Sequence, residues 1–378
     1  MFSKQEKDRR LQAAAKLIAD EGLDAIYLIG NGTVGTNAFG NFRYFTDNRA
    51  FYFLQSAIIT ADGRLSAIVG SQMAMLNLKG RSFADDYIVD GDQIGGVISF
   101  LRRNGSEKGR LGVIKELLPS PWYLRLMKEL PELQLVDVTK GLFEIRMHKS
   151  EEEADALRQC GKIAAAGYEA FKKAAVPGAY EHEVVAEVIK AMQRMGADTY
   201  FMLIASGRFS KEESCLTTLH NTAGIDRRLE KGDTVCMEIT PYFNGNWTQL
   251  VRTISVGGYN ADADEFRRAV VKGIDAAVSE IRAGVPIGNV VKKMREAVEA
   301  DGYRLEMPVG HICGADLNEE RTTEDNDRPL LKGMCVILHP TVLNDSLKSG
   351  IYWGESYLVT EDGCEDLMES SRELYCTV

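Results

Sequence analysis

Histidine is the side chain whose ordinary pKa lies nearest neutrality, so each one marks a place where a protein could move protons. This chain contains five, namely His148, His182, His220, His311 and His339. The first two stand beside charged residues where helices are expected to begin, which indicates solvated surface positions. The other three each lie in or beside an expected strand or loop. We expect these three to do chemistry, and a buried histidine with satisfied nitrogens is the alternative for any one of them.

These three histidines fall in a part of the chain where pairs of helices and groups of strands alternate. Ser150 is a candidate N-cap, and the three glutamates after it suit the first turn of a helix that runs to about residue 174. Further helices are expected over about 180–195, 261–283 and 287–301, with strands over 199–207, 233–240 and 249–256 and a last block of strands ending at residue 359. This order indicates an internal duplication, although no sequence repeat is visible. Such a duplication forms a cleft between its halves.

The first 145 residues alternate expected helices and strands, as a small α/β domain does. A helix is expected over residues 4–22, a buried strand over 24–30, and a strand pair over 51–60 and 65–69 with a turn between them. We therefore expect two domains, one of residues 1–147 and one of residues 148–378.

Composition narrows the possible partners and location. The 378 residues suffice for two hydrophobic cores, and 55 Asp and Glu against 45 Lys and Arg give a formal net charge of −10, so neither nucleic acid nor a membrane is an expected partner. The charged N-terminus lacks the apolar region of a secretory signal, and we expect a cytoplasmic protein. Seven scattered cysteines without a Cys-x-x-Cys pair are typical of reduced thiols.

Several segments resemble one known superfamily. Residues 232–253, from Gly-Asp-Thr-Val-Cys-Met-Glu to Gln-Leu-Val-Arg-Thr, are similar to a motif of the creatinase, prolidase and methionine-aminopeptidase superfamily. Further matches keep the family order at 206–207 with 220–221, 310–314, 332–340 and 357–365, and residues 41–46 resemble an N-terminal motif of the creatinase and prolidase branch. The resemblance implies an α+β protein with a small α/β N-terminal domain and a C-terminal pita-bread domain of pseudo-two-fold duplication. It also implies a homodimer and an active site between the two halves of the C-terminal domain.

Metal-dependent members of that superfamily hold two divalent ions with two aspartates, one histidine and two glutamates, because hard dications need several anionic oxygens. The matching positions here carry Glu238, Gln249, His311, His339 and Gly354. Four formal negative charges are thus reduced to one, or to two if the neighbouring Glu355 turns inward. We predict that the two-metal centre is absent and that no cofactor is needed. A single transition metal on Glu238, His311 and His339 is the alternative.

This chain resembles creatinase, which works without a metal and uses a histidine as general acid and base. His220 stands where the resemblance places that histidine. The resemblance implies that His220 takes a proton from water and returns it to a leaving nitrogen. Glu238 is expected to orient the water or to stabilise a cationic part of the substrate. His311 and His339 are expected to donate hydrogen bonds to a developing oxyanion.

The substrate is expected to be a small nitrogen compound, such as a cyclic amidine, a ureido acid or an amide. Val251 and Gly354 stand where creatinase carries the glutamates that hold a guanidinium, so creatine is not the expected substrate. Residues 353–356 and 372–375 loosely resemble the ectoine-hydrolase branch, which is also metal-free. Candidate substrate-binding side chains are Gln249, Arg321, Glu355, Trp247 and Tyr242.

Each of these binding candidates has a structural alternative. The planar guanidinium of Arg321 suits a substrate carboxylate, but a surface position within a charged run is equally consistent with the sequence. Trp247 and Tyr242 would line the pocket, and core positions are the alternative for both. Arg252 is expected to pair within the fold rather than with a ligand.

Two other functions stay open on the sequence. The first is a metallopeptidase that cuts Xaa-Pro peptides, against which positions 249, 339 and 354 argue. The second is a catalytically inactive pita-bread module that binds peptides, as some histone-chaperone subunits do. Three histidines near the expected cleft favour an enzyme.

Overall fold

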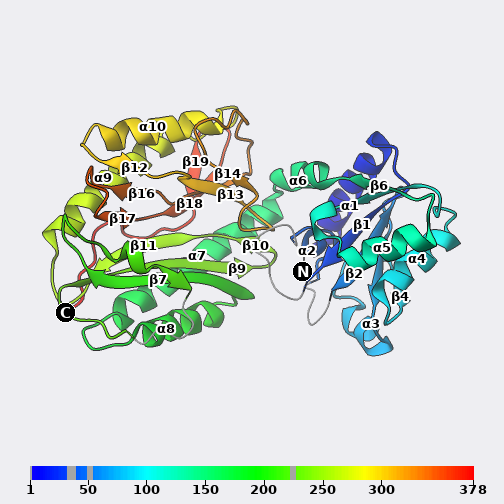
Figure 1. Cartoon of the computed structure of the whole chain (residues 1–378), viewed down its shortest axis with the longest axis horizontal. Helices are drawn as coiled ribbons and strands as arrows, with labels where there is room; N and C mark the ends of the chain where they lie inside the picture. The colour runs from blue at the N-terminus through cyan, green and yellow to red at the C-terminus, as the bar shows by residue number, and fades with distance from the viewer. Residues whose placement is uncertain (1, 32–39, 49–53, 222–226) are drawn as a thin grey trace. The chain divides into compact units, whose positions relative to one another are not determined.

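The computed structural model describes residues 2–31, 40–48, 54–221 and 227–378. Two compact units divide the chain, Met1–Glu152 and Glu153–Val378 (Figure 1). Within the described residues, no helix combines the length and the apolar character needed to cross a lipid bilayer. Part of the expected strand over 51–60 lies outside the described residues.

The first unit is a small α/β domain, as expected from the sequence. Its six-stranded mixed sheet has the order β4-β3-β2-β1-β5-β6, in which β1 pairs antiparallel with β2 and parallel with β5. The strands are β1 (Ala25–Gly30), β2 (Gln55–Thr60), β3 (Leu65–Val69), β4 (Asp86–Val89), β5 (Arg110–Val113) and β6 (Gln134–Asp137). The helices are α1 (Lys4–Asp20), α2 (Gly40–Thr46), α3 (Gln72–Leu78), α4 (Gln93–Arg103), α5 (Ser120–Glu129) and α6 (Thr139–Met147).

Local sequence explains where the first helix begins and ends. The side chain of Ser3 accepts a hydrogen bond from the backbone N–H of Glu6, which satisfies one of the free donors at the start of α1. Gly22 follows the helix with a φ of 62°, a left-handed conformation that favours glycine. The strand β1 that comes next is buried along its whole length and forms the centre of the sheet.

The second unit follows the expected order of helix pair, strands, helix pair, strands. Its first half contains α7 (Glu151–Ala174), α8 (Glu181–Arg194), β7 (Thr199–Arg208), β8 (His220–Asn221), β9 (Asp233–Phe243), β10 (Asn246–Trp247) and β11 (Leu250–Ser255). Its second half contains α9 (Ala261–Val278), α10 (Ile287–Glu299), β12 (Arg304–Leu305), β13 (Gly310–Cys313), β14 (Glu320–Arg321), β15 (Cys335–Leu338), β16 (Thr341–Leu343), β17 (Gly350–Tyr352), β18 (Glu355–Val359) and β19 (Cys364–Asp366). Helix α9 ends earlier than expected, because Ser279 caps it with hydrogen bonds to the carbonyls of Asp275 and Ala276.

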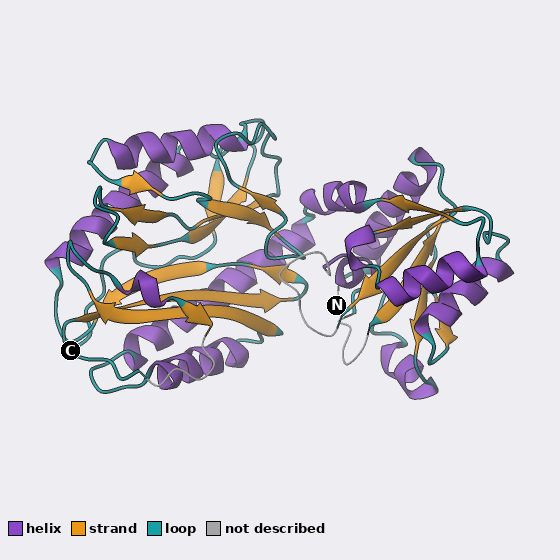
Figure 2. Cartoon of the chain, viewed as in Figure 1, coloured by secondary structure: helices purple, strands orange, loops and turns teal. Residues whose placement is uncertain are grey.

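Strand layers lie between the two helix pairs in this unit (Figure 2). The first half forms a sheet of order β10-β9-β7-β8 with β11 on β9, and the second half forms sheets β12-β16-β17 and β14-β13-β15-β18-β19. Reciprocal backbone hydrogen bonds between Val251 and Gly354, at 2.9 and 3.0 Å, join the halves. This bridge brings the end of β17 and the start of β18 next to β9 and β11.

The two faces of β9 have different neighbours. Ile239 faces α7, because a β carbon built on Gly167 of that helix would lie 2.9 Å from Cγ2 of Ile239. Successive residues of a strand point to opposite faces, so Met237 shares the helix-covered face with Ile239. Glu238, Thr240 and Tyr242 therefore face the second half of the unit.

Candidate active site

The hydroxyl of Tyr352 connects side chains from both halves of the second unit. It lies 2.9 Å from Oε2 of Glu238 and 3.0 Å from Nδ1 of His339, and Nε2 of Gln249 donates to it at 3.4 Å. The ring of His311 packs edge-on against His339, with 5.0 Å between the ring centroids. We call these five residues the Tyr352 cluster. It contains four residues that the sequence singled out and one, Tyr352, that it did not.

Strand pairing positions the members of this cluster. Glu238 stands in the middle of β9, opposite Val251 of β11. Gln249 directly precedes β11, and its backbone N–H and carbonyl both bond the hydroxyl of Ser356 on β18 at 2.9 Å. His311 lies in β13, His339 directly follows the neighbouring β15, and Tyr352 ends β17.

Burial gives the cluster unusual electrostatics. Removal from water raises the pKa of Glu238 to about 7, although hydrogen bonds from Tyr352 and Thr240 favour its ionised form. Burial lowers the pKa of His339 to about 4, and burial together with the neighbouring His339 lowers the pKa of His311 to about 3. At neutral pH both imidazoles are therefore uncharged, while Glu238 exchanges between its two protonation states.

Two buried polar atoms of the cluster and one of Trp247 have no hydrogen-bond partner among the described residues. They are Oε1 of Gln249, Nδ1 of His311 and Nε1 of Trp247. An unpaired buried polar group costs about 1–3 kcal/mol, so a ligand that supplies the missing partners would bind favourably there. The atoms include a hydrogen-bond acceptor on Gln249 and a donor on Trp247.

The two aromatic candidates lie on the same face of the sheet as Glu238. Tyr242 follows Glu238 by four residues in β9, and Trp247 of β10 pairs with Tyr242. Their ring centroids are 4.7 Å apart, and both side chains are buried. They pack as an aromatic pair on the same face of the sheet as Glu238.

The structure does not bring His220 to the Tyr352 cluster, contrary to the sequence expectation of one shared site. His220 pairs with Ile204 of β7, and Ile204 pairs with Met237, so His220 stands on the helix-covered face. Its Nε2 lies 3.2 Å from Oε2 of the buried Glu181, at the start of α8. The register of strand pairing determines on which face His220 lies, because a shift of one residue between paired strands would move its side chain to the other face of the sheet.

Glu355 does not turn toward the cluster either. Its carboxylate accepts hydrogen bonds from Arg252, Tyr357 and Arg372, the last through Nε at 3.0 Å. These partners hold the pKa of Glu355 below its ordinary value against the opposing effect of burial. Arg252 is fully buried and pairs within the fold, as its sequence context indicated. Glu355 is thus engaged in a structural ion pair rather than available as a ligand-binding group.

Arg321 lies at the edge of the sheet that carries His311. The two residues are cross-strand partners between β14 and β13, so their side chains project from the same face. The arginine is exposed and makes no ion pair within the described residues. Both sequence interpretations of Arg321, a surface cation and an anion-binding group, agree with this position.

Comparisons with known proteins decide the family. Residues 155–361, more than half of the chain, match metallopeptidase family M24, and residues 10–148 match the creatinase/prolidase N-terminal domain. The chain belongs to metallopeptidase family M24.

Relatives in this family include characterised enzymes. A creatinase of a Bacillus species is 25% identical over 97% of this chain and 91% of its own length. An Xaa-Pro dipeptidase of Pyrococcus furiosus is 28% identical over 63% of this chain and 67% of its own length. An X-Pro aminopeptidase structure from Thermotoga maritima superposes with a TM-score of 0.83 at 20% identity, covering 97% of this chain and 99% of that one. The expected superfamily, the pita-bread fold and the C–N hydrolase class are confirmed.

The residues at the expected metal-ligand positions lie in or beside the Tyr352 cluster. Across the described ranges, no three His, Cys, Asp or Glu side chains converge as a metal-binding group. Gly354, which the sequence resemblance matches to a family glutamate, has no side chain, and a β carbon there would lie 2.5 Å from Cβ of His339. Gln249 is neutral, and Tyr352 bridges Glu238 and His339 through its hydroxyl. The residues therefore do not fit a two-metal centre, nor the single-metal alternative.

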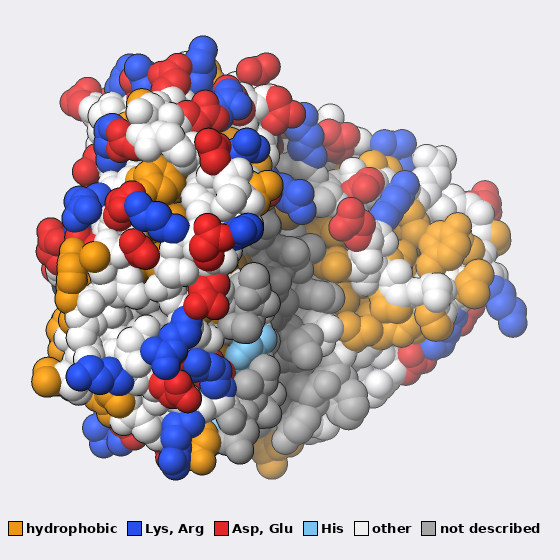
Figure 3. Space-filling view, turned by 60° about the vertical axis from the view of Figure 1, so that its left-hand side comes forward, with side chains coloured by type: hydrophobic (Ala, Val, Ile, Leu, Met, Phe, Trp, Pro, Cys, Tyr) orange, Lys and Arg blue, Asp and Glu red, His pale blue; other side chains and the backbone are white. Residues whose placement is uncertain are grey.

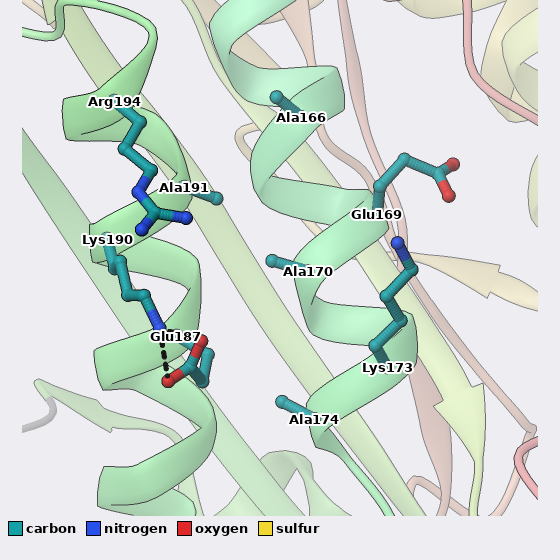
Figure 4. Close-up of a pocket in the computed structure, with 9 residues that line it drawn as sticks. All are labelled: Ala166, Glu169, Ala170, Lys173, Ala174, Glu187, Lys190, Ala191 and Arg194. Atoms are coloured by element: carbon teal, nitrogen blue, oxygen red, sulfur yellow. Dashed lines mark hydrogen bonds and ion pairs between the residues drawn. The ribbon is translucent and has the colours of Figure 1, made fainter.

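A groove elsewhere in this M24 domain is not part of the site. It has a volume of about 390 Å³ and lies between α7 and α8, where alanines of the two helices face each other (Figure 4). Its edges carry Glu169, Lys173, Glu187, Lys190 and Arg194. None of the residues singled out from the sequence lines it.

Figure 3 draws one face of the molecule as a space-filling surface. On the described part of the face drawn in Figure 3, cationic and anionic side chains are interspersed.

Sequence reasoning missed Tyr352, which stands two residues before Gly354 in an otherwise apolar stretch. A tyrosine next to strand residues usually indicates a core position. The only available signal was its closeness to a family ligand position, because its contacts with Glu238 and His339 depend on the pairing of distant strands.

Proposed function

We propose that this chain is a metal-independent hydrolase that cleaves a C–N bond in a small nitrogen compound, with Glu238 as the group that stores the transferred proton. The hydrogen-bonded series of Glu238, Tyr352 and His339 supports this proposal, because it joins a carboxyl group of raised pKa to an imidazole of lowered pKa. Groups whose pKa values are pushed apart in this way suit acid–base chemistry near neutral pH.

In the proposed reaction, water attacks the carbon of an amide, ureido or amidine group, and Glu238 takes up the proton that water loses. The C–N bond then breaks, its electron pair stays on nitrogen, and the stored proton passes to that nitrogen. His311 is neutral at this pH, so it acts on the developing oxyanion as a hydrogen-bond donor and not as a cation. Glu238 thereby takes the proton-transfer role first expected of His220.

The surroundings of the cluster support a substrate that carries N–H groups and a carboxylate. The unpartnered Oε1 of Gln249 would accept a hydrogen bond from a substrate N–H. Arg321 is exposed beside His311 and suits a carboxylate through its planar fork. Trp247 and Tyr242 would bound the ligand on one side.

Activity of chelator-treated protein tests this proposal. We expect one of a panel of amides, ureido acids and cyclic amidines to be hydrolysed at a rate that neither the chelator nor added Mn²⁺, Co²⁺ or Zn²⁺ changes. Glu238→Gln should lower kcat by about 100-fold or more, as the loss of a general acid–base group does. Glu365→Gln is a control, because that carboxylate pairs with Arg158 on a partly exposed surface.

The same panel distinguishes the two alternatives when it includes Xaa-Pro dipeptides and longer peptides. Cleavage of Xaa-Pro dipeptides only after metal is added would replace this proposal with a metallopeptidase function. Saturable peptide binding without turnover of any compound would replace it with a binding module. Both results are distinguishable from hydrolysis of a small compound by metal-free protein.

We further propose that the protein works as a homodimer in the cytoplasm. All seven cysteines are free thiols in the structure, which suits a reducing compartment. Large exposed apolar side chains of the first unit, including Met73, Leu76 and Leu124, are the kind of surface that subunit contacts cover. Sedimentation of the purified chain tests the dimer, and a monomer at micromolar concentration would contradict it.

A further inference from the structure

The neighbours of Tyr352 allow two complete hydrogen-bonding patterns with the same heavy-atom positions. A phenol has one O–H to donate and can accept two hydrogen bonds. When Glu238 is ionised, Tyr352 donates to its Oε2 and accepts from Nδ1 of His339 and Nε2 of Gln249. When Glu238 is protonated, the carboxyl donates to Tyr352, and Tyr352 donates to Nδ1 of His339. In both patterns Gln249 donates to the phenol.

These two patterns differ in the tautomer of His339. An ionised Glu238 requires the ring proton on Nδ1, which leaves Nε2 as an acceptor. A protonated Glu238 requires a bare Nδ1, which puts the ring proton on Nε2 and makes it a donor. The proton on Glu238 and the proton on His339 therefore change together through Tyr352.

Burial differs between Glu238 and His339, the two ends of this hydrogen-bonded series. Glu238 is only 4% exposed, and its second carboxylate oxygen is 3.3 Å from the hydroxyl of Thr240. His339 is partly exposed, and its Nε2 lies outside the contact with Tyr352. Of the two residues, His339 is thus the less buried end of this hydrogen-bonded series.

We infer that Tyr352 relays protons between His339 and Glu238, so that Nε2 of His339 exchanges protons with water and with the leaving nitrogen while Glu238 stores the proton. The inference rests on the proposed hydrolase function and specifies how its proton moves.

Each step of the relay balances. As water attacks, its oxygen forms a bond to the substrate carbon, and one of its protons goes to Nε2 of His339. The Nδ1 proton moves to the oxygen of Tyr352, and the phenol proton moves to Oε2 of Glu238. When the C–N bond breaks, its electron pair stays on nitrogen and takes the proton from Nε2. The phenol then returns a proton to Nδ1, and Glu238 returns its proton to the phenol.

The electrostatics support this route. Burial lowers the pKa of His339, so an imidazolium that kept both protons would be unfavourable. Passing the Nδ1 proton onward lets His339 accept a proton while it stays neutral. Other titratable groups face the relay from β13, β14 and β9, namely His311, its neighbour Arg321, and Cys236, whose thiol pKa burial raises. The pKa shifts of His311 and Cys236 keep both uncharged near neutral pH.

A measurement without substrate tests the relay. Nitrogen-15 NMR of the full-length, ligand-free protein reports which ring nitrogen of His339 carries the proton. We expect the proton to move from Nδ1 to Nε2 as the pH is lowered from about 9 to 5, with the midpoint at the ionisation of Glu238. Tyr352→Phe and Glu238→Gln should each abolish this change. Tyr357→Phe is a matched control, because its hydroxyl bonds another buried carboxylate, that of Glu355, and the change should persist.

Turnover supplies the second measurement. Tyr352→Phe should lower kcat by about 100-fold or more, leave KM within about threefold, and remove the near-neutral ionisation from the pH profile. A wild-type His339 tautomer that stays the same from pH 5 to 9, or a Tyr352→Phe variant that changes like wild type, would overturn the relay. Absence of hydrolysis by wild type would instead refute the proposed function, because the NMR result does not depend on turnover.

Discussion

The backbone of Gly354 packs closely against Cα and Cβ of His339. A β carbon at position 354 would lie 2.5 Å from Cβ and 2.7 Å from Cα of His339, and 2.8 Å from the carbonyl oxygen of Leu338. Two of these three neighbours are backbone atoms, which cannot move aside without shifting the chain. A side chain at position 354 would therefore require the backbone around His339 to shift.

Gly354→Ala is expected to lower the free energy of unfolding by about 1–3 kcal/mol, because the added methyl group overpacks the site. Urea denaturation measures this loss. Gly363→Ala is the control, since the nearest atom to a β carbon there is Oγ1 of Thr360 at 4.0 Å. Equal losses in the two variants would contradict the close packing of Gly354 on His339.

Glu238→Gln should change the pH dependence of stability. The pKa of Glu238 is raised from 4.5 to about 7, so the folded protein holds an extra proton between these pH values. Wild type therefore loses stability from this residue as the pH rises through that range, by about 3 kcal/mol, and the variant does not. Denaturation of both proteins from pH 4.5 to 8 should show the variant gaining relative to wild type. Glu361→Gln at the exposed surface should show no such trend.

Glu355→Ala should destabilise the protein by about 3–5 kcal/mol, because it leaves the fully buried Arg252 without its carboxylate. Glu365→Ala removes a carboxylate whose partner Arg158 is partly exposed, and should cost less than about 1 kcal/mol. Thermal and urea unfolding compare the two. Similar stability of both variants would mean that the buried pair does not hold the halves of the unit together.

His339→Ala and His220→Ala should affect turnover differently. The first removes a member of the Tyr352 cluster and should lower kcat by about 100-fold or more. The second removes a side chain on the opposite face of the sheet, where it contacts Glu181, and should leave kcat within about threefold. Steady-state kinetics on one substrate measure both effects. A large loss of kcat in His220→Ala would return the proton-transfer role to His220.

Arg321→Ala should weaken binding of a substrate that carries a carboxylate by about 10- to 100-fold and leave its uncharged amide analogue unaffected, because a charge-assisted hydrogen bond is lost. The exposed position of Arg321 predicts no change in stability. Calorimetric titration with the two compounds measures the difference. If both compounds bind equally well before and after the substitution, Arg321 is a surface cation only.

Local sequence was sufficient for most of the secondary structure. The apolar spacing before Gly22 predicted α1, and Ser150 with the glutamates after it predicted the start of α7. Helix spacing and turn residues act over a few positions, so they can be read from neighbours in the chain. The exposed positions of His148 and His182 followed from the same local evidence.

The site was predictable only in part, because its members meet through strand pairing. Glu238, Gln249, His311 and His339 could be named from motif positions, but the contacts among them could not be. His220 was expected beside them and lies on the other face. Glu355 was a candidate substrate-binding residue and is held by two arginines instead.

The sequence by itself determined which residue types stand at the positions that resemble family metal ligands, and from these we predicted that few negative charges remain for a metal. Residue type can be read at each position without any knowledge of the strand pairing. The tertiary structure alone decided that Tyr352 joins Glu238 to His339 and that His220 is separated from both. A strand alternates its faces at every residue, so only the register between distant strands determines which side chains share a face.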